Sequence, residues 1–542
     1  MVATFILLDP FDLNLIGRLT GNYDAIAATM PADVDVYMGI NLLNVNQERL
    51  TELQTTFQDA ANNTDAESDV NDMKDELEDL WQEVEDDFDM TLENDVLPWI
   101  GQYAGIGIKD VRFNEWGEPE ELDILLAIET RDPQATDDFL AKLMAILEDN
   151  NRDLRFDSTT FKEVTIYESD RGYDELALAR ANNILYIALN ARSIRNAIDT
   201  EKSNSLAQQE AFKNAIAKLP RDRGLTLFWT PDLVDEWVDE QGGDKRTFTS
   251  QGITAVVMAA SLVDEGIRLD SVMTYDPDKV SETTAALLAD DISFKIDNLL
   301  PADTLGYIAG NRLDLSWQIG RDALIDIVGK SDFNEVMDEF EQELGFNPDT
   351  DLAPYLNGEW TMALIPSSNN IVAEETGVDL GIMALVGISD AAVLQRVADD
   401  LADALEDAGE EVDTLTYEGQ PAYEVYDYSN EPTFTYHVGE KFLTLTSSYA
   451  ELERLAVGDR LPQSDRYKQV WRAFPRGMKP VLYADVTGMI TTLLNGLTGY
   501  DREDFEQVSP LLQPITAVAA ATESSQTLSH QTMLIFIETN TK

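Results

Sequence analysis

The stretch PADVDVYMGINLL, residues 31–43, determines how this chain is organised, because a related stretch, PADTLGYIAGNRL, occurs at 301–313. Six of the thirteen positions are identical without a gap, and residue 301 follows residue 31 by 270 positions. Self-similarity at a fixed separation is the signature of a repeated architecture. The two stretches therefore predict the openings of two copies of one unit.

The same pairing recurs in chain order at five further places. The matched positions are mainly apolar or aromatic, and their separations stay between 255 and 270 residues, as loop insertions would produce. A period of this length is far longer than a solenoid repeat, so each copy should be a domain. The matched segments are 95–101 with 351–357, 126–128 with 384–386, 184–187 with 442–445, 219–228 with 474–483, and 253–256 with 515–518.

These matches predict four parts of the chain. A first repeat unit covers 31–276 and a second covers 299–542, separated by a linker over 277–298. The linker follows Asp276 and carries a short helical stretch through Leu288. Residues 1–30 precede the first unit.

The segment 1–30 begins with an apolar run, Val2–Leu8, followed by Asp9-Pro10-Phe11-Asp12. The run is far too short to span a bilayer, and no basic residue precedes it. We expect it to be the outer end of a membrane anchor whose upstream part is missing. A longer apolar run encoded upstream would support this expectation.

Helical periodicity appears at matched places in both copies. The clearest predicted helix is 65–90, with one apolar stripe and acidic residues opposite, and its counterpart is 333–344. A second helix is predicted after Asp132, which can cap it, and its counterpart after Asp390. Alternating or β-rich stretches lie near 35–41, 104–109, 122–130, 161–168, 174–180, 184–190 and 225–230.

Short turns join several of these strands. Asn182-Asn183 and Gly439-Glu440 mark tight turns, and 253–275 is predicted as a long hairpin that turns at Asp264-Glu265-Gly266. Short turns favour an antiparallel sheet over a doubly wound one. The predicted fold class is α+β: two homologous units, each a curved, mostly antiparallel sheet with two or three helices packed on one face.

The charge balance excludes some partners. With 38 Lys and Arg against 102 Asp and Glu, the formal net charge is −64. A field of this sign repels phosphate backbones and anionic lipid, so no nucleic-acid partner is expected, and membrane contact is expected only through an N-terminal anchor. A solvated surface that resists aggregation is the simplest interpretation. Adaptation to salt, loose binding of divalent cations and attraction to a basic partner remain alternatives.

Residue usage argues against most catalytic chemistry. The chain has no cysteine and two histidines, which excludes thiolate catalysis, cysteine-bound metals, disulfides and a histidine-rich metal site. There is no G-x-S-x-G nucleophile motif. His437 lies on a predicted strand and His530 just before the last one, and the aligned residues of the first copy are Ala179 and Arg268. We predict no catalytic residue and no enzymatic activity.

Ligand-binding motifs are also missing. There is no H-E-x-x-H, complete EF-hand loop or Walker loop, and Gly105-Ile106-Gly107 lacks the third glycine of a dinucleotide fingerprint. No cofactor is predicted. Calcium remains an alternative, because acidic clusters could supply oxygen ligands, so the metal site is unknown. The clusters are Asp33/Asp35, Asp86/Asp87/Asp89 and Asp349/Asp351, and the tryptophans that could line a sugar or lipid groove are Trp81, Trp99 and Trp116, with Trp81 expected in the core.

The Pro-Ala-Asp…Tyr openings at 31–37 and 301–307, and the segments at 95–101 and 351–357, resemble a bacterial family catalogued as a domain of unknown function, number three-three-five-two. The long hairpin that ends each copy fits as well. The resemblance covers nearly the whole chain from residue 31. It implies an extracytoplasmic protein with an N-terminal membrane anchor, and it implies no known activity or site.

Three functions remain open. The first is a non-enzymatic, extracytoplasmic surface or envelope protein that binds or scaffolds a protein partner or forms a homo-oligomer. The second is a carrier of a hydrophobic ligand, lipid or lipoprotein, because a curved sheet over helices can enclose an apolar cavity. The third is a carboxylate-based hydrolase, since any fold can bring two acids together. Two facing acids in an aromatic cleft would favour the third.

Overall fold

The computed structural model describes residues 26–42, 47–62, 90–113, 119–150, 154–169, 176–200, 204–233, 235, 252–289, 295–368, 370–428 and 430–539. They form two compact units. Unit 1 contains the described residues of 26–51, 90–263 and 268–279, and unit 2 contains those of 52–62, 264–267 and 280–539.

The strands of unit 1 are β1 (Val36–Asn41), β2 (Ile100–Phe113), β3 (Pro119–Thr130), β4 (Phe156–Phe161), β5 (Val164–Ser169), β6 (Ala177–Ala181), β7 (Ile184–Ala188), β8 (Leu225–Trp229), β9 (Ile253–Val263) and β10 (Gly266–Tyr275). Its helical elements are η1 (Leu92–Val96), α5 (Pro133–Asn150), α6 (Ala191–Asp199), η2 (Leu206–Gln208) and α7 (Glu210–Ile216), and α3 (Gln47–Ala61) spans the division between the units.

The strands of unit 2 are β11 (Gly306–Asn311), β12 (Glu359–Pro366), β13 (Leu380–Gly387), β14 (Glu411–Tyr417), β15 (Gln420–Tyr426), β16 (Pro432–Val438), β17 (Phe442–Thr446), β18 (Lys479–Ala484), β19 (Ile515–Ser525) and β20 (Leu528–Ile537). Its helices are α9 (Glu282–Ala289), α10 (Leu313–Val328), α11 (Lys330–Leu344), α12 (Ile371–Thr376), α13 (Ala391–Ala408), α14 (Tyr449–Arg454), α15 (Asp465–Arg472), α16 (Val486–Gly496) and α17 (Gly499–Leu512), with short turns η4 (Ile296–Asn298), η5 (Pro348–Leu352), η6 (Ala353–Tyr355) and η7 (Leu461–Gln463).

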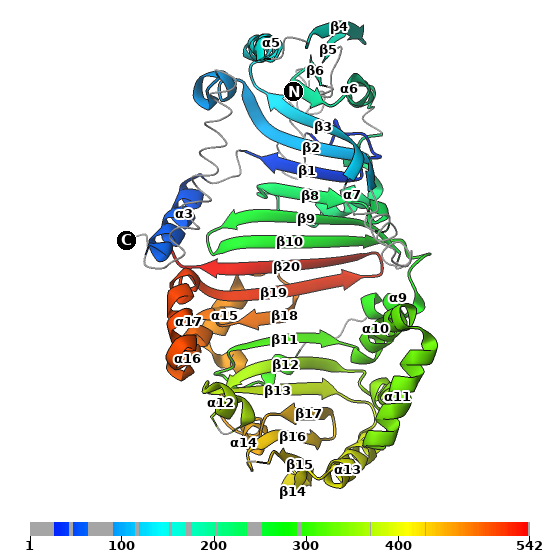
Figure 1. The fold of residues 1–542 in the computed structure, drawn as a ribbon, viewed down its shortest axis with the longest axis vertical. Coiled ribbons are helices and arrows are strands. Elements are labelled where there is room, and N and C mark those ends of the chain that lie inside the picture. Colours follow the sequence, from blue (N-terminus) through cyan, green and yellow to red (C-terminus); the bar gives the residue numbers. More distant parts are fainter. Residues whose placement is uncertain are drawn as a thin grey trace, which may run out of the picture. The chain divides into compact units, whose positions relative to one another are not determined.

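Strand pairing in the two units follows one scheme (Figure 1). In unit 1 the hydrogen-bonded order is β10-β9-β8-β1-β2-β3-β7-β6-β5-β4. In unit 2 the order is β20-β19-β18-β11-β12-β13-β17-β16-β15-β14. Every pair with a recorded register is antiparallel, so the prediction of a mostly antiparallel sheet is confirmed.

Most of the predicted elements are present. The helix predicted after Asp132 is α5, and the one after Asp390 is α13, with the Asp390 carboxylate accepting from the amides of Ala392 and Val393 at 3.0 and 3.1 Å. The helix at 333–344 is the larger part of α11, and the hairpin at 253–275 is β9–β10. The helix predicted at 65–90 lies outside the described residues, apart from its last position.

The opening motif anchors each unit in the same manner. Pro31 forms a bridge with Ser205, and Pro301 forms one with Arg460. The aspartate of each Pro-Ala-Asp motif makes an ion pair, Asp33 with Lys109 and Asp303 with Arg454. Residues 26–30 also pack in the core, where Ile26 approaches Gly105 and Met30 approaches Gly107 of β2, so that a Cβ on either glycine would collide.

Helices pack on both faces of each sheet, so the prediction of helices on one face is wrong. In unit 2, α15 packs through Tyr467 on the face that carries Tyr307, whereas α13 packs on the opposite face over Tyr423 and Tyr436. In unit 1, α7 and α5 are divided between the two faces in the same way. Helices occupy both faces because successive residues of the outer strands are buried, so side chains on both sides of these strands must be packed against other elements.

Leu394 of α13 lies at the centre of this second core and is almost fully buried. Leu394→Ala should lower the free energy of unfolding by about 2–5 kcal/mol through lost burial and the cavity left behind. Urea denaturation followed by circular dichroism measures the change. The exposed Arg396→Ala on the same helix should stay within about 0.5 kcal/mol of wild type. Equal effects of the two substitutions would contradict this packing.

A buried polar chain distinguishes the core of unit 2 from that of unit 1. Tyr467 donates a hydrogen bond to Asp297 at 2.8 Å, and the hydroxyls of Tyr307 and Tyr467 lie 2.8 Å apart. Because the Tyr467 proton is used on Asp297, Tyr307 is the donor in that pair. Burial raises the pKa of Asp297, and the Tyr467 hydrogen bond opposes the shift. In unit 1 the corresponding cluster is Tyr37, Phe212 and Phe228, in edge-to-face contact.

Asp297→Asn tests the chain. A carboxyl whose pKa is raised on folding stabilises the fold in its neutral form, so its contribution is lost as the pH rises through the raised value. The variant cannot ionise and still offers an oxygen to Tyr467. Its unfolding free energy relative to wild type should therefore increase as the pH rises above about 4, measured by urea denaturation at several pH values. Asp459→Asn, an exposed aspartate, gives the baseline for removing one charge. A pH-independent difference would contradict the assignment.

Candidate functional site

The central strands of each unit have one closed face and one open face. In unit 2, burial alternates along β13 and most of β12, and Ile308 of β11 is exposed between the buried Tyr307 and Ala309, so Tyr307, Ala363 and Met383 share a buried face. The closed face is covered by helices, as Tyr467 of α15 over Tyr307 shows. In an antiparallel sheet the opposite face is commonly polar and solvated. Here it is apolar.

The apolar residues of this open face form a row across unit 2. Register places Leu482 opposite Ile308, Ile308 opposite Met362, Met362 opposite Ala384, and Ala384 opposite Leu445. Neighbours in such a row have Cβ atoms about 4.5–5.5 Å apart, so they make one continuous surface.

Exposure of these side chains is high for their type. Met362 is 48% exposed, Leu445 43% and Ile308 40%, and Leu364 and Ile382, which face each other one step along the strands, each exceed a third. Single exposed apolar residues are ordinary, but a contiguous set marks an interaction surface. We refer to Ile308, Met362, Leu364, Ile382 and Leu445 as the open apolar face.

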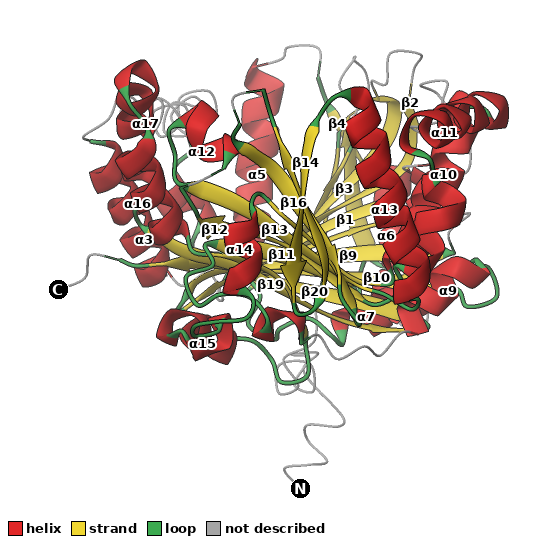
Figure 2. Ribbon diagram, turned by 90° about the horizontal axis from the view of Figure 1, so that it is seen from below, coloured by secondary structure: helices red, strands yellow, loops and turns green. Residues whose placement is uncertain are grey.

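Helices stand at both ends of the strands that carry this face. In unit 2, α10, α11 and α13 lie at one end and α16 and α17 at the other, with the strands between them (Figures 1 and 2). These helices also carry apolar side chains that are more than a third exposed: Leu324, Val328, Val336, Phe340, Val508 and Leu512.

Unit 1 has a matching row that is less exposed. Register joins Met258, Leu227, Met38, Ile106, Leu126 and Ile187 across β9, β8, β1, β2, β3 and β7. Met258 is the exposed residue of this row, and the other five are half-buried. The two rows occupy equivalent positions in the two strand orders, with Met38 corresponding to Ile308.

The five side chains of the open apolar face include no acid, base or nucleophile, and what they offer is apolar contact. Burying these side chains against an apolar ligand would contribute a favourable free energy of about 25 cal/mol for each Å² of apolar surface removed from water. The two histidines lie elsewhere.

The structure places His437 on β16, as predicted, and His530 inside β20 rather than before it. Nδ1 of His437 lies 2.8 Å from the carbonyl of Pro421, and Nδ1 of His530 lies 3.4 Å from the Glu523 carboxylate. Both side chains are buried. His437 is held by its contact with the neighbouring strand. Nε2 of His530 also lies 3.3 Å from Oγ1 of Thr532, so Glu523, His530 and Thr532 form a chain of contacts, but the Thr532 side chain is fully buried and solvent does not reach it.

The acidic clusters that could hold calcium are engaged by the protein where they are described. Asp33 pairs with Lys109. Asp349 accepts from Nε1 of Trp317 at 2.7 Å and from Arg321 at 3.4 Å, and Asp351 accepts from the amide of Asn347 at 2.9 Å. Asp86/Asp87/Asp89 lies outside the described residues. Within the described ranges, no group of three or more acidic or histidine side chains has the arrangement of a metal site.

The other singled-out residues are structural. Gly105 and Gly107 lie in the middle of β2, where Tyr37 and Met30 pack on them, so they form no phosphate loop. Trp99 is buried against Phe139 and Leu140 and donates to the carbonyl of Asp95 at 2.7 Å. Trp81 and Trp116 lie outside the described residues. Among described helices, none is both long and apolar enough to cross a bilayer.

The matching openings, the hairpin that ends each unit and the paired strand orders agree with a family assignment. The family described as "Protein of unknown function (DUF3352)" matches residues 4–537. The chain belongs to this family. The description of the family names no activity, and no functionally curated protein matches the chain.

Among solved structures, this chain is similar to crystal forms of TP0453. For crystal form I the TM-score is 0.23 at 9% identity, over 49% of this chain and 84% of that one. For crystal form III the TM-score is 0.23 at 8% identity, over 49% and 85%. At these scores the likeness supports no inference about function.

Sequence reasoning missed the open apolar face. Its signal is present in 362–366 of β12 and in Leu380–Gly387, which are apolar runs without a polar residue at alternate positions. Such runs are typical of strands buried on both faces. Only the tertiary structure shows that the second face of these strands is open.

Calcium binding can be tested against the contacts of Asp349. Because its carboxylate already accepts from Trp317 and Arg321, calcium should raise the melting temperature no more than magnesium does at equal ionic strength. Differential scanning calorimetry with each chloride salt measures this, with Asp349→Asn as the matched variant. A calcium-selective rise that disappears in Asp349→Asn would contradict the expectation.

Proposed function

We propose that this chain is a non-enzymatic, extracytoplasmic binding protein whose open apolar face takes up an aliphatic ligand. The observation that carries the proposal is the set of five adjacent apolar side chains in unit 2, each more than a third exposed. The chain is strongly acidic elsewhere, with a net charge of −64, so this patch stands against a polar background. A contiguous apolar patch on such a protein is a candidate binding surface.

Composition of the face favours a lipid-like ligand. The five residues are Ile308, Met362, Leu364, Ile382 and Leu445, all aliphatic or thioether side chains. Protein hot spots are instead enriched in Trp, Tyr and Arg. Methionine and leucine adapt to irregular apolar shapes, which suits a flexible chain. A carrier of a lipid or of the acyl part of a lipoprotein uses a surface of this kind.

Absence of enzymatic activity is part of the proposal. Buried carboxyls that could act as acids have structural partners: Glu451 accepts from the amides of Ser447 and Ser448, and Glu424 from the amide of Tyr449 and the hydroxyl of Thr435. Burial raises the pKa of Glu451, which its hydrogen bonds oppose. These contacts support a capping role for both acids.

We also propose that the two units are homologous copies, with boundaries near 31–276 and 299–542. The support is the equivalent strand order, the same bridge at each Pro-Ala-Asp opening and the matched rows through Met38 and Ile308. The apolar row is more exposed in unit 2 than in unit 1, which supports unit 2 as the copy that binds the ligand.

A second candidate is a protein partner or a second copy of this chain, supported by the helices of unit 2. Leu324 and Val328 on α10, and Val336 and Phe340 on α11, recur at spacings of four and are all more than 40% exposed. Stripes of this spacing are what helical partners recognise.

The ligand proposal predicts the effect of polar substitutions. The triple variant Ile308→Ser, Met362→Ser, Leu445→Ser should bind the neutral apolar fluorophore N-phenyl-1-naphthylamine at least about 10-fold more weakly, because three apolar contacts are lost. Fluorescence titration measures the affinity. Val457→Ser, which changes an exposed valine away from this face, should stay within about 2-fold of wild type.

Native mass spectrometry of protein taken from its host membrane fraction separates the two candidates. A co-purifying apolar small molecule, lost in the triple variant, supports the carrier. A dimer or protein complex that survives the triple variant but dissociates in Val336→Ser, Phe340→Ser supports the second candidate. Wild-type and triple variants with equal dye affinity and no bound lipid would overturn the carrier proposal, and a cytosolic location in fractionation would overturn the extracytoplasmic part.

A further inference from the structure

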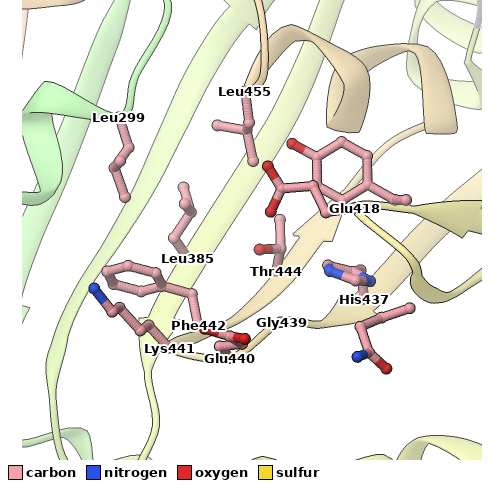
Figure 3. Close-up of a pocket in the computed structure, with 12 residues that line it drawn as sticks. Leu299, Leu385, Glu418, His437, Gly439, Glu440, Lys441, Phe442, Thr444 and Leu455 are labelled. Atoms are coloured by element: carbon pink, nitrogen blue, oxygen red, sulfur yellow. The ribbon is translucent and has the colours of Figure 1, made fainter.

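A cavity of about 460 Å³ lies in unit 2 beside the hairpins of β14 to β17, on the closed side of the sheet (Figure 3). Small-molecule sites have volumes of about 300–1,000 Å³. This cavity is separate from the open apolar face, because Thr444 and Leu385 in its wall alternate with Leu445 and Ala384. Its lining is Leu299, Leu385, Tyr417, Glu418, Gln420, His437, Gly439, Glu440, Lys441, Phe442, Thr444 and Leu455.

The floor of the cavity is a row of three residues on adjacent strands. Register places Leu385 opposite Thr444 and Thr444 opposite His437. Figure 3 shows Thr444 lying between the other two. All three side chains are buried.

The equivalent row of unit 1 is built differently. Ala127 lies opposite Tyr186, and Tyr186 lies opposite Ala179. The Tyr186 ring is almost fully buried, its hydroxyl bonds to Thr29, and burial raises its pKa to about 12. Unit 1 thus fills with a tyrosine the position where unit 2 has the much smaller Thr444, and it has a small alanine where unit 2 has an imidazole.

The imidazole of His437 offers an acceptor to the cavity. Its Nδ1 lies 2.8 Å from the carbonyl of Pro421, and a carbonyl can only accept, so Nδ1 carries the proton. Nε2 of the neutral ring is then a lone-pair acceptor. A Cβ added to Gly439 would lie 3.4 Å from this nitrogen, so the glycine borders it closely. The ring of Tyr417 stands edge-on to the imidazole, with 5.1 Å between the ring centroids.

The charges around the cavity favour a cation. Among the lining residues, Glu418 and Glu440 contribute two carboxylates and Lys441 one ammonium. Behind the lining, Arg460 binds the carbonyls of Leu299 and Leu455, and its charge and that of Glu453 both act on Tyr417 with opposite signs, so the carboxylates keep the excess. Glu418 occupies the first of two left-handed positions (φ 50°, followed by Gly419 at 82°) in the tight turn between β14 and β15, which fixes where its side chain leaves the backbone. The apolar wall is formed by Leu299, Leu385, Phe442 and Leu455.

We propose that this cavity binds a small organic amine, whose ammonium group donates a hydrogen bond to Nε2 of His437 and faces the carboxylates of Glu418 and Glu440. The apolar body of the amine packs on the leucines and Phe442. Charge-assisted hydrogen bonds are stronger than neutral ones, so the amine is favoured over the corresponding alcohol. A carboxylate of the same shape would meet two like charges and no donor at His437.

Three probes that differ only in one group test the proposal: tryptamine, tryptophol and indole-3-acetate. The chain has two histidines, so the ring C–H resonances of His437 and His530 give two separate signals in a carbon–proton NMR spectrum. Tryptamine should shift the His437 signal in a saturable manner and leave His530 unchanged. Tryptophol should bind about 3- to 10-fold more weakly, and indole-3-acetate more weakly still.

Variants locate the site and its charge. Leu385→Ala, Thr444→Tyr, His437→Ala together reproduce the unit 1 row and should weaken tryptamine binding at least about 10-fold, measured by ligand-observed NMR. Thr444→Val, which keeps the volume of the side chain, should leave binding within about 2-fold. Glu418→Gln with Glu440→Gln should remove the preference for tryptamine over tryptophol without weakening tryptophol. Calorimetric melting checks that each variant is folded.

Four results would overturn the proposal: no saturable shift of His437 with millimolar tryptamine, a shift confined to His530, undiminished binding in a folded row variant, or tighter binding of indole-3-acetate than of tryptamine. None of these depends on the open apolar face, and substitution of Met362 should leave tryptamine binding unchanged.

Discussion

The structure of each unit depends on one central strand that is hydrogen-bonded on both sides by segments far away in sequence. β1 pairs with β2 and with β8, so Met38 lies between Ile106 and Leu227, and β11 pairs in the same way with β12 and β18. Closing such long loops costs conformational entropy that only the completed sheet repays. Tyr37 and Tyr307, on the inward side of these strands, contribute the aromatic contacts that fix the register against the helices.

That central pairing divides each sheet into two faces with different roles. One face is covered, and variation there decides whether a tyrosine fills the space, as Tyr186 does, or a cavity remains beside Thr444. The other face is apolar: in unit 2, α13 covers it over the outer strands at Tyr436, and it is exposed at Met362 and its neighbours. The same strand scheme can therefore carry two kinds of binding surface without a change in topology.

The acidic composition makes this arrangement compatible with a dispersed protein. A net charge of −64 repels other copies of the chain, and this offsets the tendency of an exposed apolar patch to associate. It also biases any polar pocket toward cations. Glu418 and Glu440 beside His437 are a local case of that general field.

The sequence by itself determined the antiparallel architecture, most helix and strand positions, and the family, because apolar periodicity, caps such as Asp390 and the repeated Pro-Ala-Asp opening are local signals. It placed His437 on a strand but could not show which atoms face it, and it predicted helices on one face because apolar runs such as Leu380–Gly387 do not say what covers each side. Tertiary structure decided the open apolar face and the cavity beside Thr444, because both arise from strand register, and register brings together residues that are dozens of positions apart.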